Sequence, residues 1–123
     1  MKLTNLITAR KIFLNHAGDK IPAITAYKIM KFVKASDTED AFYNEKMKAI
    51  IDEYAEKDDK GNPVVKANGI QIQKDHIEDC NKAIKEIQDT EVETPNFKVN
   101  VSELASLQLT LEEVAALDEF IEG

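Results

Sequence analysis

The sequence predicts an α+β fold in a single domain, residues 1–123, with one long central helix, three shorter helices and a small antiparallel sheet. Three observations lead to this prediction. A helical apolar pattern extends through residues 22–57, with no proline or glycine after Pro22. Two β-rich segments flank an Asn-Gly pair at residues 68–69, which is typical of a hairpin. A strictly alternating segment at residues 97–101 predicts one further strand.

The central helix is predicted from apolar side chains that recur at steps of three and four residues. Such spacing places them along one face of an α-helix. Pro22 suits the first turn, where its missing N–H has no helical partner to lose. The face comprises two sets of residues: Ala23, Ala26, Tyr27, Met30 and Val33, and then Tyr43, Met47, Ile50, Ile51 and Tyr54.

A polar segment at residues 34–40 separates these two sets and leaves two interpretations open. In the first, one helix, straight or kinked, continues through a solvated patch. In the second, Ser36 caps a new helix and Glu39 completes a Ser-x-x-Glu capping box. We favour the single helix because no helix-breaking residue lies within it. Its end is expected in the turn-forming residues 56–63, where Gly61 can adopt positive φ and Pro63 cannot continue a helix.

The three shorter helices are predicted from their apolar faces and their ends. The first covers residues 3–16 and stops near Gly18, with Leu6, Ala9, Ile12 and Phe13 facing inward. The next begins at Asp75 and is expected to lie antiparallel to the second half of the central helix, with the hairpin as connector. Its inner face holds Ile77, Cys80, Ile84 and Ile87. The last begins at a Thr110–Glu113 capping box and buries Val114, Leu117, Phe120 and Ile121.

The sheet is expected to have three short strands. Residues 64–66 and 70–72 form the hairpin around Ala67, Asn68 and Gly69. Two such short strands are marginally stable without support. Residues 97–101 are therefore expected to pair with the hairpin as a third strand.

Charge and composition exclude several classes of protein. The net charge is −7 and Arg10 is the only arginine, which argues against direct binding to nucleic acid. No apolar run has the length of a membrane span, and no secretion signal is expected, so we expect a cytoplasmic protein that does not bind membranes. Cys80 is the sole cysteine and lies at helical spacing from two isoleucines, which predicts a buried small side chain rather than a nucleophile.

Candidate chemical motifs are weak throughout the chain. Residues 58–62 contain the residue types of a calcium loop, but Lys60 and Pro63 break the required ligand spacing. His16 and His76 have no companion at metal-ligand spacing and are expected to be surface or capping residues. Nucleophile and phosphate-loop motifs are missing. We therefore predict no enzyme activity and no catalytic, cofactor-binding or metal-binding residues.

Three segments carry a family resemblance: KIPAITAYKI at residues 20–29, IDEYAEKDDKGN at residues 51–62, and LTLEEVAALDEFIE at residues 109–122. Through them, most of the chain resembles a family of small uncharacterised proteins encoded in phages and prophages of Gram-positive bacteria. The sequence departs from that family at residues 36–40, where a more continuous helical pattern is expected. The resemblance implies a phage setting and no catalytic residues.

Two functional hypotheses follow. The first is a non-enzymatic phage accessory protein that binds another phage or host protein, or itself, through a helix face. It would act in virion or tail assembly, in the host cytoplasm or in the virion. The second is an acidic inhibitor of a host defence or nucleic-acid enzyme, suggested by the net charge of −7. The last part of the chain also contributes to this hypothesis through its acidic residues Glu112, Glu113, Asp118, Glu119 and Glu122.

Overall fold

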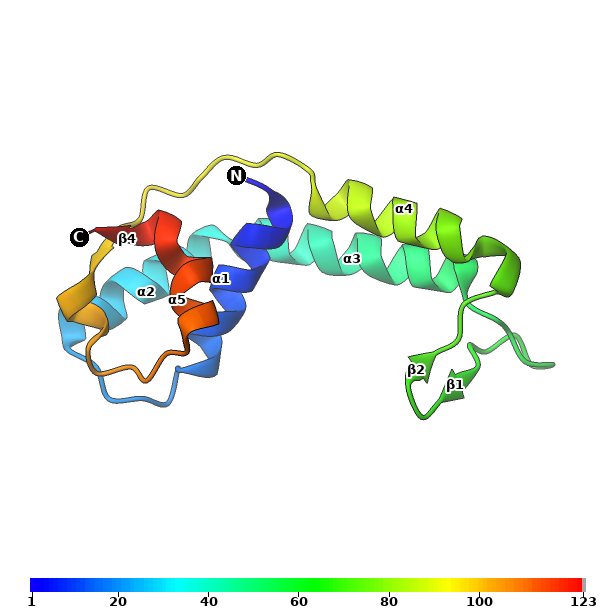
Figure 1. Cartoon of the computed structure of the whole chain (residues 1–123), viewed down its shortest axis with the longest axis horizontal. Helices are drawn as coiled ribbons and strands as arrows, with labels where there is room; N and C mark the ends of the chain where they lie inside the picture. The colour runs from blue at the N-terminus through cyan, green and yellow to red at the C-terminus, as the bar shows by residue number, and fades with distance from the viewer. Residues whose placement is uncertain (123) are drawn as a thin grey trace.

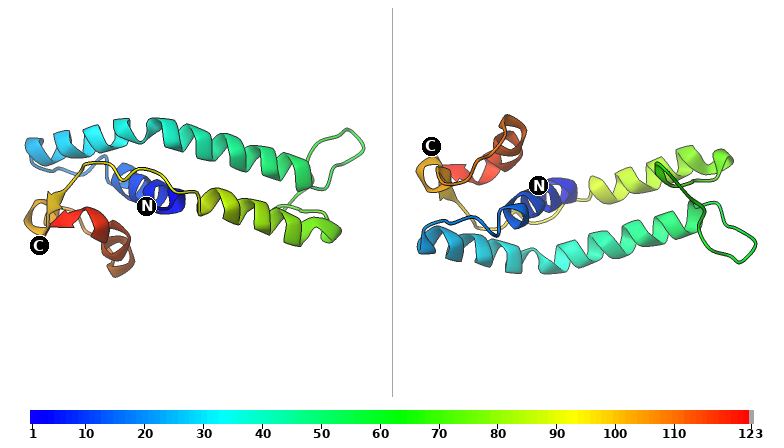
Figure 2. Two further views of the ribbon diagram at one scale, coloured as in Figure 1. Left: turned by 90° about the horizontal axis from the view of Figure 1, so that it is seen from above. Right: turned by 90° about the horizontal axis from the view of Figure 1, so that it is seen from below.

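The computed structural model describes residues 1–122 and shows an elongated molecule of two helical layers (Figure 1). One layer consists of α2 (Ala23–Ala35) and α3 (Asp37–Tyr54), which follow each other almost in line. The other consists of α1 (Leu3–Asn15) and α4 (Ile77–Gln88), which lie one after the other along the first layer (Figure 2). Within residues 1–122, no helix is both long and apolar enough to cross a membrane.

The predicted single central helix is divided at Ser36, so this prediction needs correction. Ser36 has φ −95° and ψ 1°, outside the helical region, and its hydroxyl donates to the Val33 carbonyl at 2.9 Å. Hydrogen bonds of this kind from serine back to the preceding turn bend helices. The second interpretation, in which a new helix begins after Ser36, located the break correctly. The capping box that it predicted between Ser36 and Glu39 is wrong. The Ser36 side chain does not cap α3, and Glu39 Oε2 is buried without a hydrogen bond.

The hydrophobic core lies at one end of the molecule, which we call the head: α1, α2 and residues 92–122. Four phenylalanine rings meet there, with neighbouring centroids 4.9 to 5.8 Å apart. They are Phe13 of α1, Phe32 of α2, Phe97, and Phe120 of the 3₁₀ helix η3 (Asp118–Phe120). Leu6, Ala9 and Ile12 are buried with them, as predicted for the inner face of the first helix. The end of the chain thus packs against its beginning.

The rest of the molecule, which we call the arm, comprises α3, α4 and the hairpin between them. Strands β1 (Val65–Lys66) and β2 (Gly69–Ile70) pair antiparallel, which confirms the predicted hairpin. A 3₁₀ turn, η1 (Lys74–His76), leads into α4, which returns alongside α3 as predicted. Cys80 is buried, but Ile77 is 47% exposed and does not belong to the inner face of α4. The inner face of α4 therefore begins at Cys80, one turn later than predicted.

The predicted third strand pairs elsewhere. Strand β3 (Val99–Asn100) lies parallel to β4 (Ile121–Glu122) in the head, far from the hairpin (Figure 1). The alternation at residues 97–101 correctly predicted that Phe97 and Val99 are buried, and both pack in the head core. It was wrong for Val101, which is 59% exposed and follows the strand. The hairpin instead receives support from the residues that follow α3, through bridges of Ala55 with Ile72 and of Lys57 with Pro63.

The final part of the head begins with a 3₁₀ helix, η2 (Val101–Leu104), and continues to α5 (Leu111–Leu117). The Thr110–Glu113 capping box of α5 is confirmed. The Glu113 N–H donates to Thr110 Oγ1 at 3.1 Å, and the Thr110 N–H donates to Glu113 Oε1 at 3.0 Å. Leu117 and Phe120 are buried as predicted, whereas Val114 is exposed and not part of the core.

Candidate docking groove

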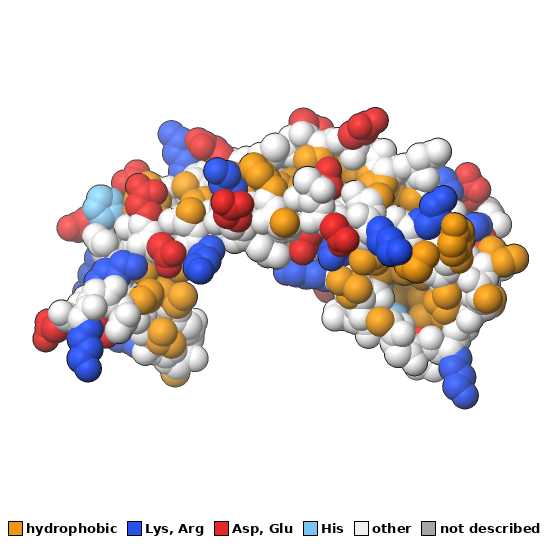
Figure 3. Space-filling model, turned by 180° about the vertical axis from the view of Figure 1, so that it is seen from behind, with side chains coloured by type: hydrophobic (Ala, Val, Ile, Leu, Met, Phe, Trp, Pro, Cys, Tyr) orange, Lys and Arg blue, Asp and Glu red, His pale blue; other side chains and the backbone are white. Residues whose placement is uncertain are grey.

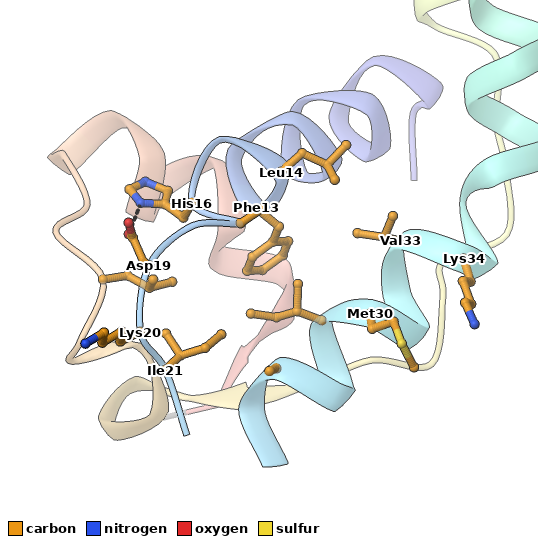
Figure 4. Close-up of a pocket in the computed structure, with 13 residues that line it drawn as sticks. Phe13, Leu14, His16, Asp19, Lys20, Ile21, Met30, Val33 and Lys34 are labelled. Carbon is orange, nitrogen blue, oxygen red and sulfur yellow. Dashed lines mark hydrogen bonds and ion pairs between the residues drawn. The ribbon is translucent and has the colours of Figure 1, made fainter. Parts of the chain in front are cut away.

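An open groove of about 560 Å³ lies in the head between the C-terminal half of α1, the loop at residues 16–21, and α2 (Figure 4). Most of its surface is apolar. On the face of the molecule in Figure 3, apolar side chains gather over the head around this hollow. The lining residues are Phe13, Leu14, His16, Ala17, Asp19, Lys20, Ile21, Ala26, Ile29, Met30, Val33, Lys34 and Leu107.

Two large apolar side chains at the groove remain accessible to solvent. Leu14 is 46% exposed and Met30 is 41% exposed, although both line a concave surface. Ile24 and Tyr27, on the same helix as Met30, are also exposed. Contiguous exposed apolar surface of this kind is typical of interaction sites on soluble proteins.

The groove lies in a basic part of an acidic molecule. Residues 1–36 contain seven of the 16 lysines and arginines but only one of the 23 acidic residues, Asp19. Helix α2 has three lysines and no acidic residue. Lys20 and Lys34 lie at opposite ends of the groove (Figure 4). A ligand in the groove would therefore meet positive charge at both ends.

One α2 lysine is already paired. Lys28 Nζ lies 2.9 Å from Glu103 Oε1, and Glu103 also accepts from the Thr25 hydroxyl. The hydrogen bond from Lys28 is the main reason that the pKa of Glu103 is lowered. This pair attaches α2 to η2 and stabilises one side of the head.

His16 connects the wall of the groove to α5. Its Nδ1 lies 2.7 Å from Asp19 Oδ2, and its Nε2 lies 3.3 Å from Glu113 Oε2. The pKa of His16 is raised, chiefly by the hydrogen bond with Asp19, which outweighs partial burial. The pKa of Glu113 is lowered, first by the Thr110 N–H and then by His16. The predicted position of His16 at a helix end is confirmed, but its partner Glu113 is 97 residues away.

Cys80 and the turn at residues 58–62 lie outside the head, away from the groove. Burial raises the pKa of the Cys80 thiol, which disfavours the reactive thiolate. Asp58 Oδ1 accepts the backbone N–H groups of Lys60 and Asn62, which makes the segment a turn, as predicted. Among residues 1–122, no three His, Cys, Asp or Glu side chains are placed to hold one metal ion.

A second apolar hollow of about 610 Å³ lies on the C-terminal side of the head, next to α5. Val114 of α5 and Asp118 of η3 line it, and Leu107 lines both hollows. The charge here is the opposite of that at the groove, because residues 99–122 contain six acidic residues and no lysine or arginine. The head therefore presents a basic apolar surface and an acidic apolar surface.

Three comparisons with known proteins found no relative of this chain. No family model, no curated protein and no solved structure matches this chain.

Proposed function

We propose that this protein is a non-enzymatic interaction protein whose groove binds an amphipathic helix with acidic residues at its ends. The observation that carries this proposal is the groove itself, an apolar hollow with exposed Leu14 and Met30 and a lysine at each end. Helix-in-groove binding uses apolar anchors at steps of three and four residues. A volume of about 560 Å³ accommodates several such side chains.

The ionisable groups of the groove support binding more than catalysis. His16 and Asp19 are hydrogen-bonded to each other, and the two lysines lie at the ends of the groove. Lysines at the rim of an interface increase the association rate with acidic partners and select against basic ones. Charge complementarity thus determines which helices the groove accepts.

The biological setting of this proposal comes from the sequence resemblance. It is a phage or prophage accessory function in the host cytoplasm or the virion, with a phage or host protein as partner. Assembly of a virion or tail is the process we propose. Placement of the gene beside tail genes supports that process, whereas placement among early genes would contradict it.

Two designed peptides test the groove directly. Both are amphipathic helices with the same apolar anchors, but one has glutamates at its ends and the other has lysines. We expect the glutamate peptide to bind, to shift the NMR resonances of Leu14, Met30 and Val33, and to dissociate as salt is added. Met30→Asp should abolish binding, whereas Val65→Asp, at an exposed position of the hairpin, should not. Equal binding of both peptides, or shifts away from the groove, would contradict the proposal.

A second candidate function is inhibition of a basic host enzyme that acts on nucleic acid. It is favoured by residues 99–122, where six acidic residues occur without a basic one. Such an inhibitor would lose potency when Glu112 and Glu119 are changed to glutamine, and also at high salt. Inhibition that is insensitive to both changes would exclude this electrostatic mechanism.

A further inference from the structure

We propose that a second copy of this chain occupies the groove through Leu111 and Val114 of α5, so that two copies form a closed dimer. This inference rests on the proposed use of the groove and names its occupant. It follows from three features of the head: an exposed apolar protrusion, opposite charges on two surfaces, and the closeness of these surfaces.

The apolar protrusion is the first turn of α5. Leu111 is 86% exposed, more than any other large apolar side chain among residues 1–122. Val114, which follows at the i+3 position, is also exposed, so the two side chains share one helix face. The Thr110–Glu113 capping box holds this turn in place. Because the turn is already ordered, little conformational entropy is lost when it docks.

The charges of the two surfaces are complementary. Glu112, Asp118 and Glu119 lie near Leu111 and Val114 in the sequence, and residues 99–122 contain no basic residue, although Lys98 donates to the Glu119 carbonyl. The groove has Lys20 and Lys34 at its ends and lies among residues whose charges are mostly positive. Attraction between such surfaces orients two copies as they meet. A second α5 therefore has the chemistry that the groove is proposed to select.

Helix α5, which carries the protrusion on another face, lies next to the groove in each copy. Glu113 of α5 contacts His16, which lines the groove, at 3.3 Å. Adjacent complementary surfaces allow a two-fold axis between them, so that each copy places its Leu111 in the groove of the other. The two contacts form together, which closes the dimer and prevents growth into a filament.

Sedimentation of the full chain over a range of concentrations tests the proposal, with dimer expected at the upper end, up to about 1 mM. Leu111→Glu and Met30→Glu should each give monomers with unchanged circular dichroism. The control Val65→Glu, at an exposed apolar position of the hairpin, should remain dimeric. A dimer that persists in Leu111→Glu would overturn the proposal, since the copies would then associate through another surface.

Mixing the two monomeric variants gives a sharper test. Leu111→Glu keeps an intact groove and Met30→Glu keeps an intact protrusion, so a mixture restores one of the two contacts. We expect weaker association than in the wild type, with NMR shifts at Leu14 and Val33 of the Leu111→Glu partner. No association in the mixture would overturn the proposal.

The proposed function and this inference can fail separately. A wild-type chain that stays monomeric but binds the glutamate peptide in its groove would overturn the second copy as occupant and keep the groove as a docking site. A monomeric chain that binds neither peptide would overturn both.

Discussion

Arg10 of α1 connects the two helical layers. Its Nη1 donates to the Val33 carbonyl at 2.6 Å, to Ser36 Oγ at 2.9 Å and to Asp37 Oδ1 at 2.7 Å. The planar guanidinium can serve several acceptors at once, which a lysine ammonium does less well. Arg10 thus holds α1 against the junction between α2 and α3.

Replacement of Arg10 by methionine should lower the free energy of unfolding by about 2 kcal/mol, the usual range for hydrogen bonds to a charged group. Arg10→Lys should recover only part of this loss. Urea denaturation measures both variants. The control is Lys11→Met, at an exposed neighbouring position, where we expect a change within about 0.5 kcal/mol. Similar losses at both positions would show that the hydrogen bonds of Arg10 contribute little.

His16 should make stability depend on pH. Because its pKa is raised, the folded chain binds the imidazole proton more tightly than the unfolded chain does. This contribution is fully present below the ordinary pKa of 6.5 and is lost as the pH rises through the folded-state pKa. The pKa of Glu113 is lowered, so its contribution is present above the ordinary value of 4.5 and is lost as the pH falls.

Thermal unfolding of the wild type and of His16→Gln at several pH values tests this coupling. The difference between their midpoints should be largest near pH 5.5 and should shrink towards about pH 9. A difference that is the same at every pH would mean that His16 contributes through packing and not through its charge.

At the scale of elements, α5 is a short helix that depends on its cap. It has seven residues, and helices of this length are not stable in isolation. Thr110→Ala removes the hydrogen bond to the Glu113 N–H and should lower stability by about 1 kcal/mol. Ser106→Ala, at an exposed serine in the same connection, is the matched control and should have little effect. Chemical denaturation measures the free energy of unfolding of both variants, and equal losses would contradict a role for the cap.

Helix α2 is held in the head by Phe32. This ring is 1% exposed and contacts the rings of Phe13, Phe97 and Phe120. Phe32→Ala should lower the free energy of unfolding by about 3–5 kcal/mol because it leaves a cavity between three other segments. Phe42→Ala, at an exposed position of α3, should change it far less. A small effect of Phe32→Ala would mean that the head core repacks easily.

At the scale of the whole molecule, the core is unevenly distributed. The buried cluster belongs to the head, whereas α3 has no buried side chain and Cys80 is the only one in α4. Segments with few buried apolar contacts open at lower free energy than the core. The arm should therefore exchange its amide hydrogens faster than the head. Hydrogen exchange measured by NMR tests this, and equal protection of α3 and α1 would contradict it.

The helices and the hairpin could be predicted because they depend on neighbours in the chain. The steps of three and four in residues 3–16, the Thr110–Glu113 box and the Asn68-Gly69 turn act within a few residues. The groove had no comparable signal. Leu14 was assigned to no helix face, and Tyr27 and Met30 were placed on an apolar face that is exposed, whereas α2 buries Thr25 and Phe32. Only packing in space decides which faces stay uncovered.

The sequence alone thus determined the first helix, the hairpin, the capping box at Thr110, and the burial of Phe97, Val99 and Cys80. The tertiary structure decided what depends on distant residues. It brings Arg10 to Ser36, 26 positions later, where the central helix is divided, and it pairs Val99 with Ile121 instead of with the hairpin. It also joins His16 to Glu113 at the groove. Periodicity and capping are local interactions that a sequence displays directly, whereas hydrogen bonds and packing between distant segments exist only after the chain has folded.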